Sequence, residues 1–185
     1  MFLVSKHVPV RQLLRTGLAA LCLTLWLPGQ ADVRYEVLVQ PTGFAQCPQF
    51  FAEGQPPRRL SQAGSELQIP QGKLRELCYE AFAVLHSGES RTPVFVAQRL
   101  NRQTLATADQ KRADRFFADA RLPRGERAEL EDYKGSGYSR GHMAPAADMP
   151  THSAMAQSFS LANMVPQDIQ HNGGAWAKIE QDTRR

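Results

Sequence analysis

The strongest chemical signal in this chain is an arginine and a histidine separated by one glycine, Arg140-Gly141-His142. A neutral imidazole can take a proton from water and so act as a general base. A guanidinium can hold a phosphate group through two donors that lie in one plane. Gly141, which has no side chain, is expected to let the backbone approach a substrate closely. These residue types suit hydrolysis of a phosphodiester, although such a triplet alone is also common in solvated turns.

Asn172 offers the kind of oxygen that would serve as a metal ligand. Its side-chain carbonyl is a hard donor, which suits Mg²⁺ and is poor for Zn²⁺. One protein oxygen, completed by waters and phosphate oxygens, is a plausible shell for Mg²⁺ because this ion keeps much of its hydration. The sequence has no HxxxH, HExxH or CxxC spacing. We therefore do not expect a zinc site made wholly of protein ligands.

The order and spacing of three segments resemble the DNA/RNA non-specific endonuclease family, whose active site is a ββα-metal (His-Me finger) motif. The Asp-Arg-Gly-His hallmark of that family corresponds to Ser139–His142. Its Asn-Met-Val-Pro-Gln segment corresponds to Asn163–Gln167, and its Asn-x-Gly-x-Trp-x-x-x-Glu helix to Asn172–Glu180. The resemblance runs from about Leu77 to the end of the chain.

The resemblance implies a role for each matched side chain. His142 is expected to be the general base that activates water, and Arg140 to neutralise charge on the phosphate. Asn172 is expected to be the one direct side-chain ligand of Mg²⁺, for which Mn²⁺ would substitute. Asn163 is expected to hold the loop or to polarise groups beside the metal. Glu180 is expected to bind a water of the metal's hydration shell and not the metal ion itself. Glu180 follows Asn172 by eight helical residues, a rise of about 12 Å, which is too far for both side chains to reach one ion.

An upstream arginine is also expected to contact the phosphate. The segment 111–119 resembles the family there, and the spacing favours Arg112 over Arg115. Residues 99–127 contain eight Lys and Arg against four Asp and Glu. This excess indicates a local basic surface for a polyanion, with an ordinary solvated loop as the alternative.

The chain departs from the family pattern in two places. Ser139 stands where the family has Asp, and because Ser brings no charge we expect slower catalysis, which Ser139→Asp should accelerate. Family members usually continue with further strands after the position of Arg185, where this chain stops. The central sheet is therefore expected to lack its C-terminal strands.

The N-terminal 31 residues have the pattern of a secretory signal peptide. Three cations, Lys6, Arg11 and Arg15, precede a short apolar run over 17–27, and small residues precede a cut after Ala31. The alternative is an uncleaved anchor, but the run is too short to span a bilayer comfortably. We expect a periplasmic or secreted domain over 32–185 with no stable membrane association. Cleavage would lower the net charge from +4 to +1, so any polyanion binding must be local.

Two cysteines remain outside the signal peptide, Cys47 and Cys78. An even number in an oxidising compartment predicts one disulfide, with two buried free thiols as the alternative. It would close a loop of about 30 residues and stabilise the fold by roughly 3 kcal/mol.

We expect an α+β fold, and the resemblance implies a central antiparallel sheet that carries the ββα-metal motif. Strands are expected at 35–40, 77–86 and 94–100, the last two joined by a turn at 87–93. Residues 105–130 are expected to be loop-like, and a short helix is expected over 155–161. An amphipathic helix is expected over 172–185, with Asn172 as its N-cap and Trp176 and Ile179 on one face.

The sequence therefore predicts an exported, Mg²⁺-dependent endonuclease that hydrolyses DNA and RNA. Sequence preference is not expected, because the proposed contacts go to phosphate rather than to base edges. One alternative is a catalytically impaired, nucleic-acid-binding remnant of the family. Another is a phosphodiesterase that acts on small nucleotides.

Overall fold

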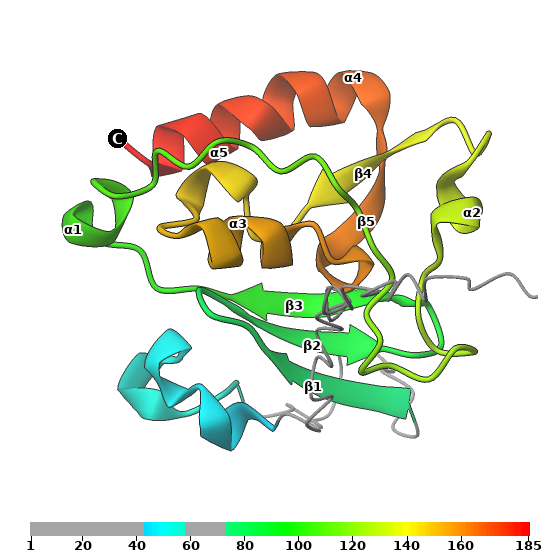
Figure 1. Cartoon of the computed structure of the whole chain (residues 1–185), viewed down its shortest axis with the longest axis horizontal. Helices are drawn as coiled ribbons and strands as arrows, with labels where there is room; N and C mark the ends of the chain where they lie inside the picture. The colour runs from blue at the N-terminus through cyan, green and yellow to red at the C-terminus, as the bar shows by residue number, and fades with distance from the viewer. Residues whose placement is uncertain (1–42, 58–72) are drawn as a thin grey trace, which may run out of the picture. The chain divides into compact units, whose positions relative to one another are not determined.

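The computed structural model describes residues 43–57 and 73–185, and Figure 1 shows their arrangement. The predicted signal peptide and the predicted strand at 35–40 lie outside the described residues. Within the described ranges, no helix has the length and apolar character needed to cross a membrane.

A three-stranded antiparallel sheet consists of β1 (Leu74–Cys78), β2 (Ala83–Ser87) and β3 (Thr92–Ala97), in that order. The single strand predicted over 77–86 is wrong, because the chain reverses between β1 and β2, where the Tyr79 N–H donates to the Phe82 carbonyl at 2.9 Å. The predicted turn after residue 86 is confirmed as the β2–β3 hairpin.

Strand β2 is buried along its whole length because both faces of the sheet are covered. Phe82 and Val84 pack with Phe159 and other residues near α3 (His152–Ser158). Ala83 and Leu85 pack on the other side, against Phe44, Cys47 and Phe51 of the segment 43–54. Figure 1 shows α3 on one side of the sheet and that segment on the other.

A disulfide between Cys47 and Cys78, as predicted, joins the segment 43–54 to the end of β1. Phe44 and Phe51 pack edge to face 4.9 Å apart in the same cluster. The disulfide therefore reinforces a packed aromatic contact.

The short helix predicted over 155–161 begins earlier, as α3 at His152. The Thr151 hydroxyl accepts the Ala154 N–H at 3.0 Å and caps it. The loop-like character predicted for 105–130 is confirmed, with α1 (Arg102–Leu105) before it and α2 (Leu130–Tyr133) at its end.

A second, two-stranded antiparallel sheet pairs β4 (Tyr138–His142) with β5 (Met164–Asp168). One continuous helical stretch follows, made of α4 (Ile169–His171), a π-helical segment (Asn172–Trp176) and α5 (Ala177–Thr183). Figure 1 shows this stretch running from the end of β5 over α3. Two strands and the helix that follows them thus form a ββα unit.

The helix begins three residues before the predicted N-cap, Asn172, so that prediction is wrong. Asp168 is the cap, because its carboxylate accepts the N–H groups of Gln170 and His171, each at 2.9 Å. The predicted apolar face also holds only in part, since Ile179 is 54% exposed. Asn172 therefore lies inside the helix.

Candidate active site

His142 ends β4 and is almost enclosed, with 7% of its surface exposed. Its ring stands perpendicular to that of Phe159, 5.0 Å between centroids. The pKa of His142 is lowered to about 4, chiefly by burial, while the positive charge of Arg112 adds to the shift and the charge of Asp114 opposes it. The imidazole is therefore neutral at pH 7, as a general base must be.

Arg112 lies beside this histidine. Its guanidinium carbon is 4.9 Å from the centroid of the Phe159 ring, the same ring that His142 meets edge to face. It also forms an ion pair with Asp114 at the exposed surface. Among the contacts of the described residues, Arg115 has neither a ring partner nor an ion pair. The structure thus places Arg112, which the spacing favours, against the same phenylalanine as His142.

Arg140 occupies the same face of β4 as His142, because side chains two residues apart in a strand point the same way. Its guanidinium carbon is 4.6 Å from the Phe116 ring and 5.9 Å from the Tyr133 ring. Phe116 also lies 6.0 Å from the His142 ring. The structure therefore gathers both arginines and the histidine around two phenylalanines.

Gly141 faces the opposite side of β4, where the Gln167 side chain covers it. A Cβ atom at Gly141 would lie 2.0 Å from Gln167 Oε1. A side chain at position 141 would therefore displace the Gln167 side chain from this face of the strand. Ser139 pairs with Gln167 across the strands and shares this face, so it points away from Arg140 and His142.

Asn163 is fully buried and fastens the chain that follows His142. Its Oδ1 accepts the Ala144 N–H at 2.9 Å, and its Nδ2 donates to the carbonyls of Ala144 and Ser158 at 3.0 and 2.9 Å. These bonds all go to backbone groups. Asn163 therefore acts as a clamp that holds the residues after β4 against the end of α3.

The helix that carries Asn172 is tied to β4 by Trp176. The indole Nε1–H donates to the His142 carbonyl at 3.2 Å. Asn172 and Trp176 lie four residues apart, which brings them to neighbouring positions on one side of the helix. Asn172 is half-buried and lies one turn before Trp176 on this side of the helix.

Glu180 continues this side of the helix one turn further along. Burial raises its pKa, Arg184 and Arg112 oppose that rise, and Asp148 adds to it. Arg184 forms an ion pair with the buried Asp148 at 3.0 Å, and Gln98 donates to the other oxygen of Asp148 at 2.9 Å. Sequence reasoning missed this contact, since a lone Asp among alanines gives no sign of partners 36 and 50 residues away.

The residues at this site fit a hydrated divalent cation rather than a tightly caged metal. In residues 43–57 and 73–185, no three His, Cys, Asp or Glu side chains form a metal-binding group. The Asn172 amide oxygen is a hard donor, and Glu180 lies further along the same helix. A hydrated ion that keeps several waters needs no more than this from the protein.

The ββα-metal nuclease fold is defined by two antiparallel strands and the helix that follows them. A histidine ends the first strand, and the helix carries an oxygen donor. The family model for DNA/RNA non-specific endonuclease matches residues 62–185. The chain therefore belongs to the DNA/RNA non-specific endonuclease family.

Curated relatives and a solved structure agree with this membership. The chain is 41% identical over 108 residues to "Nuclease EXOG, mitochondrial" of Xenopus laevis, which covers 57% of this chain and 30% of that protein. It is 38% identical over 105 residues to "Nuclease C1" of Cunninghamella echinulata var. echinulata, covering 55% and 42%. A crystal structure of the EndoG/EndoGI complex, concerned with EndoG inhibition, matches with a TM-score of 0.56 at 31% identity, over 60% of this chain and 46% of that one. The chain thus spans less than half the length of each of these relatives.

Proposed function

We propose that this protein is a metal-dependent endonuclease that hydrolyses phosphodiester bonds of DNA and RNA without sequence specificity. The observation that carries the proposal is the buried, neutral His142, flanked by Arg112 and tied through Trp176 to the helix of Asn172. These groups would supply a base, cations for the phosphate and an oxygen ligand for a metal ion. Together these three functions suit metal-dependent hydrolysis of a phosphodiester.

The reaction follows from the charges of these groups. His142 accepts a proton from a water molecule as the water oxygen bonds to phosphorus, and the bond from phosphorus to the leaving sugar oxygen breaks. Arg140 and Arg112 stabilise the negative charge that builds on the phosphate oxygens. Both guanidiniums rest on aromatic rings, which limits their movement.

Asn172 would hold Mg²⁺, with Mn²⁺ as a substitute, and Glu180 would orient the surrounding water. When bound, the cation polarises the phosphate and stabilises the charge on the leaving oxygen. Asn163 would fix the chain that follows His142 against the end of α3, through its hydrogen bonds to the backbone of Ala144 and Ser158.

Nicking of supercoiled plasmid by the purified protein, with Mg²⁺ and with EDTA, tests the proposal. We expect cleavage that needs the cation, and a loss of at least about a hundredfold in His142→Ala. His152→Ala is the matched control, because that histidine is exposed in α3 and should leave the rate unchanged. Metal-independent cleavage, or full activity of His142→Ala, would overturn the mechanism.

Absence of cleavage by a protein that circular dichroism shows to be folded would instead support the binding remnant. In that case gel-shift assays should detect retained binding of DNA or RNA. Cleavage of dinucleotides as fast as of long strands would support a phosphodiesterase for small substrates.

We also propose that the protein is exported, as the composition of residues 1–31 suggests. Mass spectrometry of the protein recovered from the cell exterior or periplasm tests this. A mature N-terminus at Asp32 is expected, whereas an intact Met1 would overturn the proposal.

A further inference from the structure

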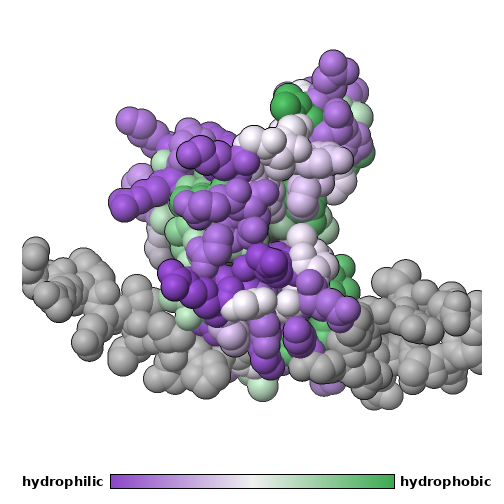
Figure 2. All heavy atoms as spheres, turned by 90° about the vertical axis from the view of Figure 1, so that its right-hand side faces the viewer, coloured by the Kyte–Doolittle hydropathy of each residue, from purple (hydrophilic) through white to green (hydrophobic). Residues whose placement is uncertain are grey.

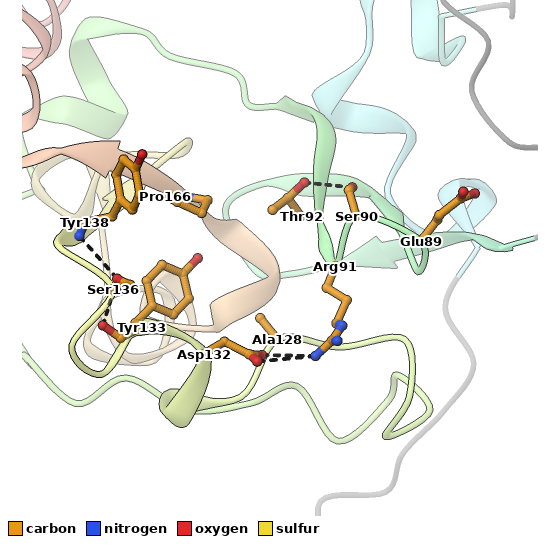
Figure 3. A pocket seen from close by; sticks show the side chains of 10 residues that line it. All are labelled: Glu89, Ser90, Arg91, Thr92, Ala128, Asp132, Tyr133, Ser136, Tyr138 and Pro166. Atoms are coloured by element: carbon orange, nitrogen blue, oxygen red, sulfur yellow. Dashed lines mark hydrogen bonds and ion pairs between the residues drawn. The ribbon is translucent and has the colours of Figure 1, made fainter.

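A cavity of about 390 Å³ lies beside β4, near the end of the strand opposite to His142. Three stretches of chain enclose it, namely the β2–β3 turn, the region of α2 and the facing parts of β4 and β5 (Figure 3). The face of the molecule that carries these stretches is mostly hydrophilic (Figure 2).

One part of the cavity is aromatic and continuous with the candidate active site. Tyr133, Tyr138 and Pro166 lie together there in Figure 3. Tyr138 is 55% exposed, which leaves its ring free to stack on a ligand. The Tyr133 ring lies 5.9 Å from the Arg140 guanidinium, so it borders both the cavity and the arginine assigned to the phosphate.

Polar groups line the rest of the cavity. The side chains of Ser90 and Thr92 form a hydrogen bond of 2.8 Å, and Arg91 pairs with Asp132 at 3.3 Å. The Tyr133 hydroxyl is buried and has no hydrogen-bond partner in the described part of the chain. Figure 3 shows it directed toward the middle of the lining residues. Burial raises the pKa of Tyr133 to about 12, so this hydroxyl keeps its proton.

We propose that this cavity is a subsite for an unpaired nucleobase, which stacks on the exposed ring of Tyr138 beside the polar groups of the lining. The proposal rests on the proposed function, because it assigns the base to the strand whose phosphate meets Arg140 and His142. Tyr138, Arg140 and His142 share one face of β4, at a rise of about 3.3 Å per residue. The stacked base therefore belongs to a nucleotide close to the scissile phosphate, about 13 Å from the histidine along the strand.

The chemistry of the cavity selects single strands. A base in a duplex is covered on both faces by its neighbours, whereas an unstacked base has a free face for an aromatic side chain. Stacking of this kind tolerates any base, so the subsite is compatible with the absence of sequence preference. Cleavage of single strands and of unpaired regions is thus favoured over cleavage of intact duplex.

The test uses single-stranded oligonucleotides with one natural phosphodiester, all other linkages being phosphorothioates. One abasic residue is placed in turn at each position around the natural linkage. We expect the wild-type cleavage rate to fall about 5- to 100-fold at one position near the linkage and to stay unchanged at distant positions. The penalty should vanish in Tyr138→Ala and persist in Tyr138→Phe, which keeps the ring.

Two further variants separate the Tyr138 ring from general damage. Tyr133→Phe removes a buried hydroxyl that bonds nothing in the described protein, so it should fold normally and keep the full abasic penalty. Leu130→Ala truncates a 41% exposed side chain of α2 outside the cavity and should keep the full penalty. An equal penalty in wild type and Tyr138→Ala, or none at any position, would overturn the subsite.

Failure of the proposed function would be visible separately, as absence of cleavage of every oligonucleotide by the wild type. The same oligonucleotides, fluorescently labelled, are then bound in EDTA and followed by anisotropy. Weaker binding of one abasic oligonucleotide by the wild type but not by Tyr138→Ala would support the subsite without catalysis. Equal binding of all of them would overturn it.

Discussion

At the scale of single residues, the protonation of His142 is set by its enclosure between Phe116 and Phe159. A protonated imidazole in this place would be poorly hydrated and would face the charge of Arg112, so the neutral form is favoured. The pKa of about 4 lies below the ordinary value of 6.5. The base therefore stays available in mildly acidic solution.

The acid limb of the pH–rate profile should reflect this shift. Because catalysis needs the neutral imidazole, kcat/KM should stay nearly constant from pH 8 down to about 5 and fall as the pH approaches about 4. With an unperturbed histidine the fall would begin near pH 6.5. NMR titration of the His142 ring in the metal-free protein measures the same pKa directly, and a midpoint at 6 or above would contradict the prediction.

Arg112→Gln provides the internal check on the cause of the shift. Removing the positive charge beside His142 should raise the histidine pKa, since one of the two effects that lower it is lost. The midpoint should remain below 6.5, because burial is the larger effect. Arg115→Gln also removes one positive charge from this exposed stretch of chain, and it should change the midpoint of the His142 titration less.

At the scale of elements, the segment between β4 and β5 is held by the buried Asn163 rather than by regular structure. Asn163→Ala would leave three buried backbone groups without partners, which costs about 1–3 kcal/mol for each group that cannot relax. We expect the free energy of unfolding in urea to fall by about 3 kcal/mol or more.

Asn101→Ala is the matched control, because it removes the same side chain from an exposed N-cap of α1. That loss should be about 1 kcal/mol. Equal losses for the two variants would show that Asn163 is not a clamp.

The end of α5 is held against the loop after β4 by Arg184, which pairs with the buried Asp148. Arg184→Gln removes a charge-assisted bond, so it should lower the free energy of unfolding by about 1.5–3 kcal/mol. Arg185→Gln should change stability by less than about 0.5 kcal/mol, since the Arg185 side chain is 69% exposed and pairs only at the surface. Urea unfolding measures both variants, and equal losses of stability would show that the Arg184–Asp148 ion pair does not hold the end of α5.

The element boundaries show where sequence reasoning succeeds. The β2–β3 turn and the disulfide followed from local residue types, and the order of the three motif segments indicated the ββα unit. The reversal between Cys78 and Ala83 contains no Gly or Pro, so the run of apolar residues read as one strand. The helix start at Ile169 was missed because Asp168 and Asn172 are both good N-caps, and only the hydrogen bonds of Asp168 distinguish them.

The candidate site was less predictable than the elements that carry it. His142, Arg140 and Asn172 follow from motif and chemistry, whereas their surroundings depend on packing between distant segments. The contact of Arg112 with the ring of Phe159 joins residues 47 positions apart in the sequence. No local pattern encodes such a contact, nor the cover that Gln167 forms over Gly141.

At the scale of the whole molecule, the two faces of the three-stranded sheet pack against different parts of the protein. Phe82 and Val84 point to the face that packs against Phe159, whose ring also meets His142. Ala83 and Leu85 point to the other face, which the segment 43–54 covers. Stability and catalysis can thus be altered separately from the two sides of β2.

The Cys47–Cys78 disulfide belongs to the second of these faces. Its loss should lower the free energy of unfolding by about 3–4 kcal/mol, the chain-entropy value for a loop closed across 31 positions. The kcat at 25 °C should change little as long as the protein stays folded, because the cysteines contact neither His142 nor the helix of Asn172. Urea unfolding of the Cys47→Ser/Cys78→Ser variant, with the reduced wild type alongside, measures the first effect, and plasmid nicking measures the second. A large fall in kcat with little change in the unfolding midpoint would show instead that the segment 43–54 supports the catalytic face through β2.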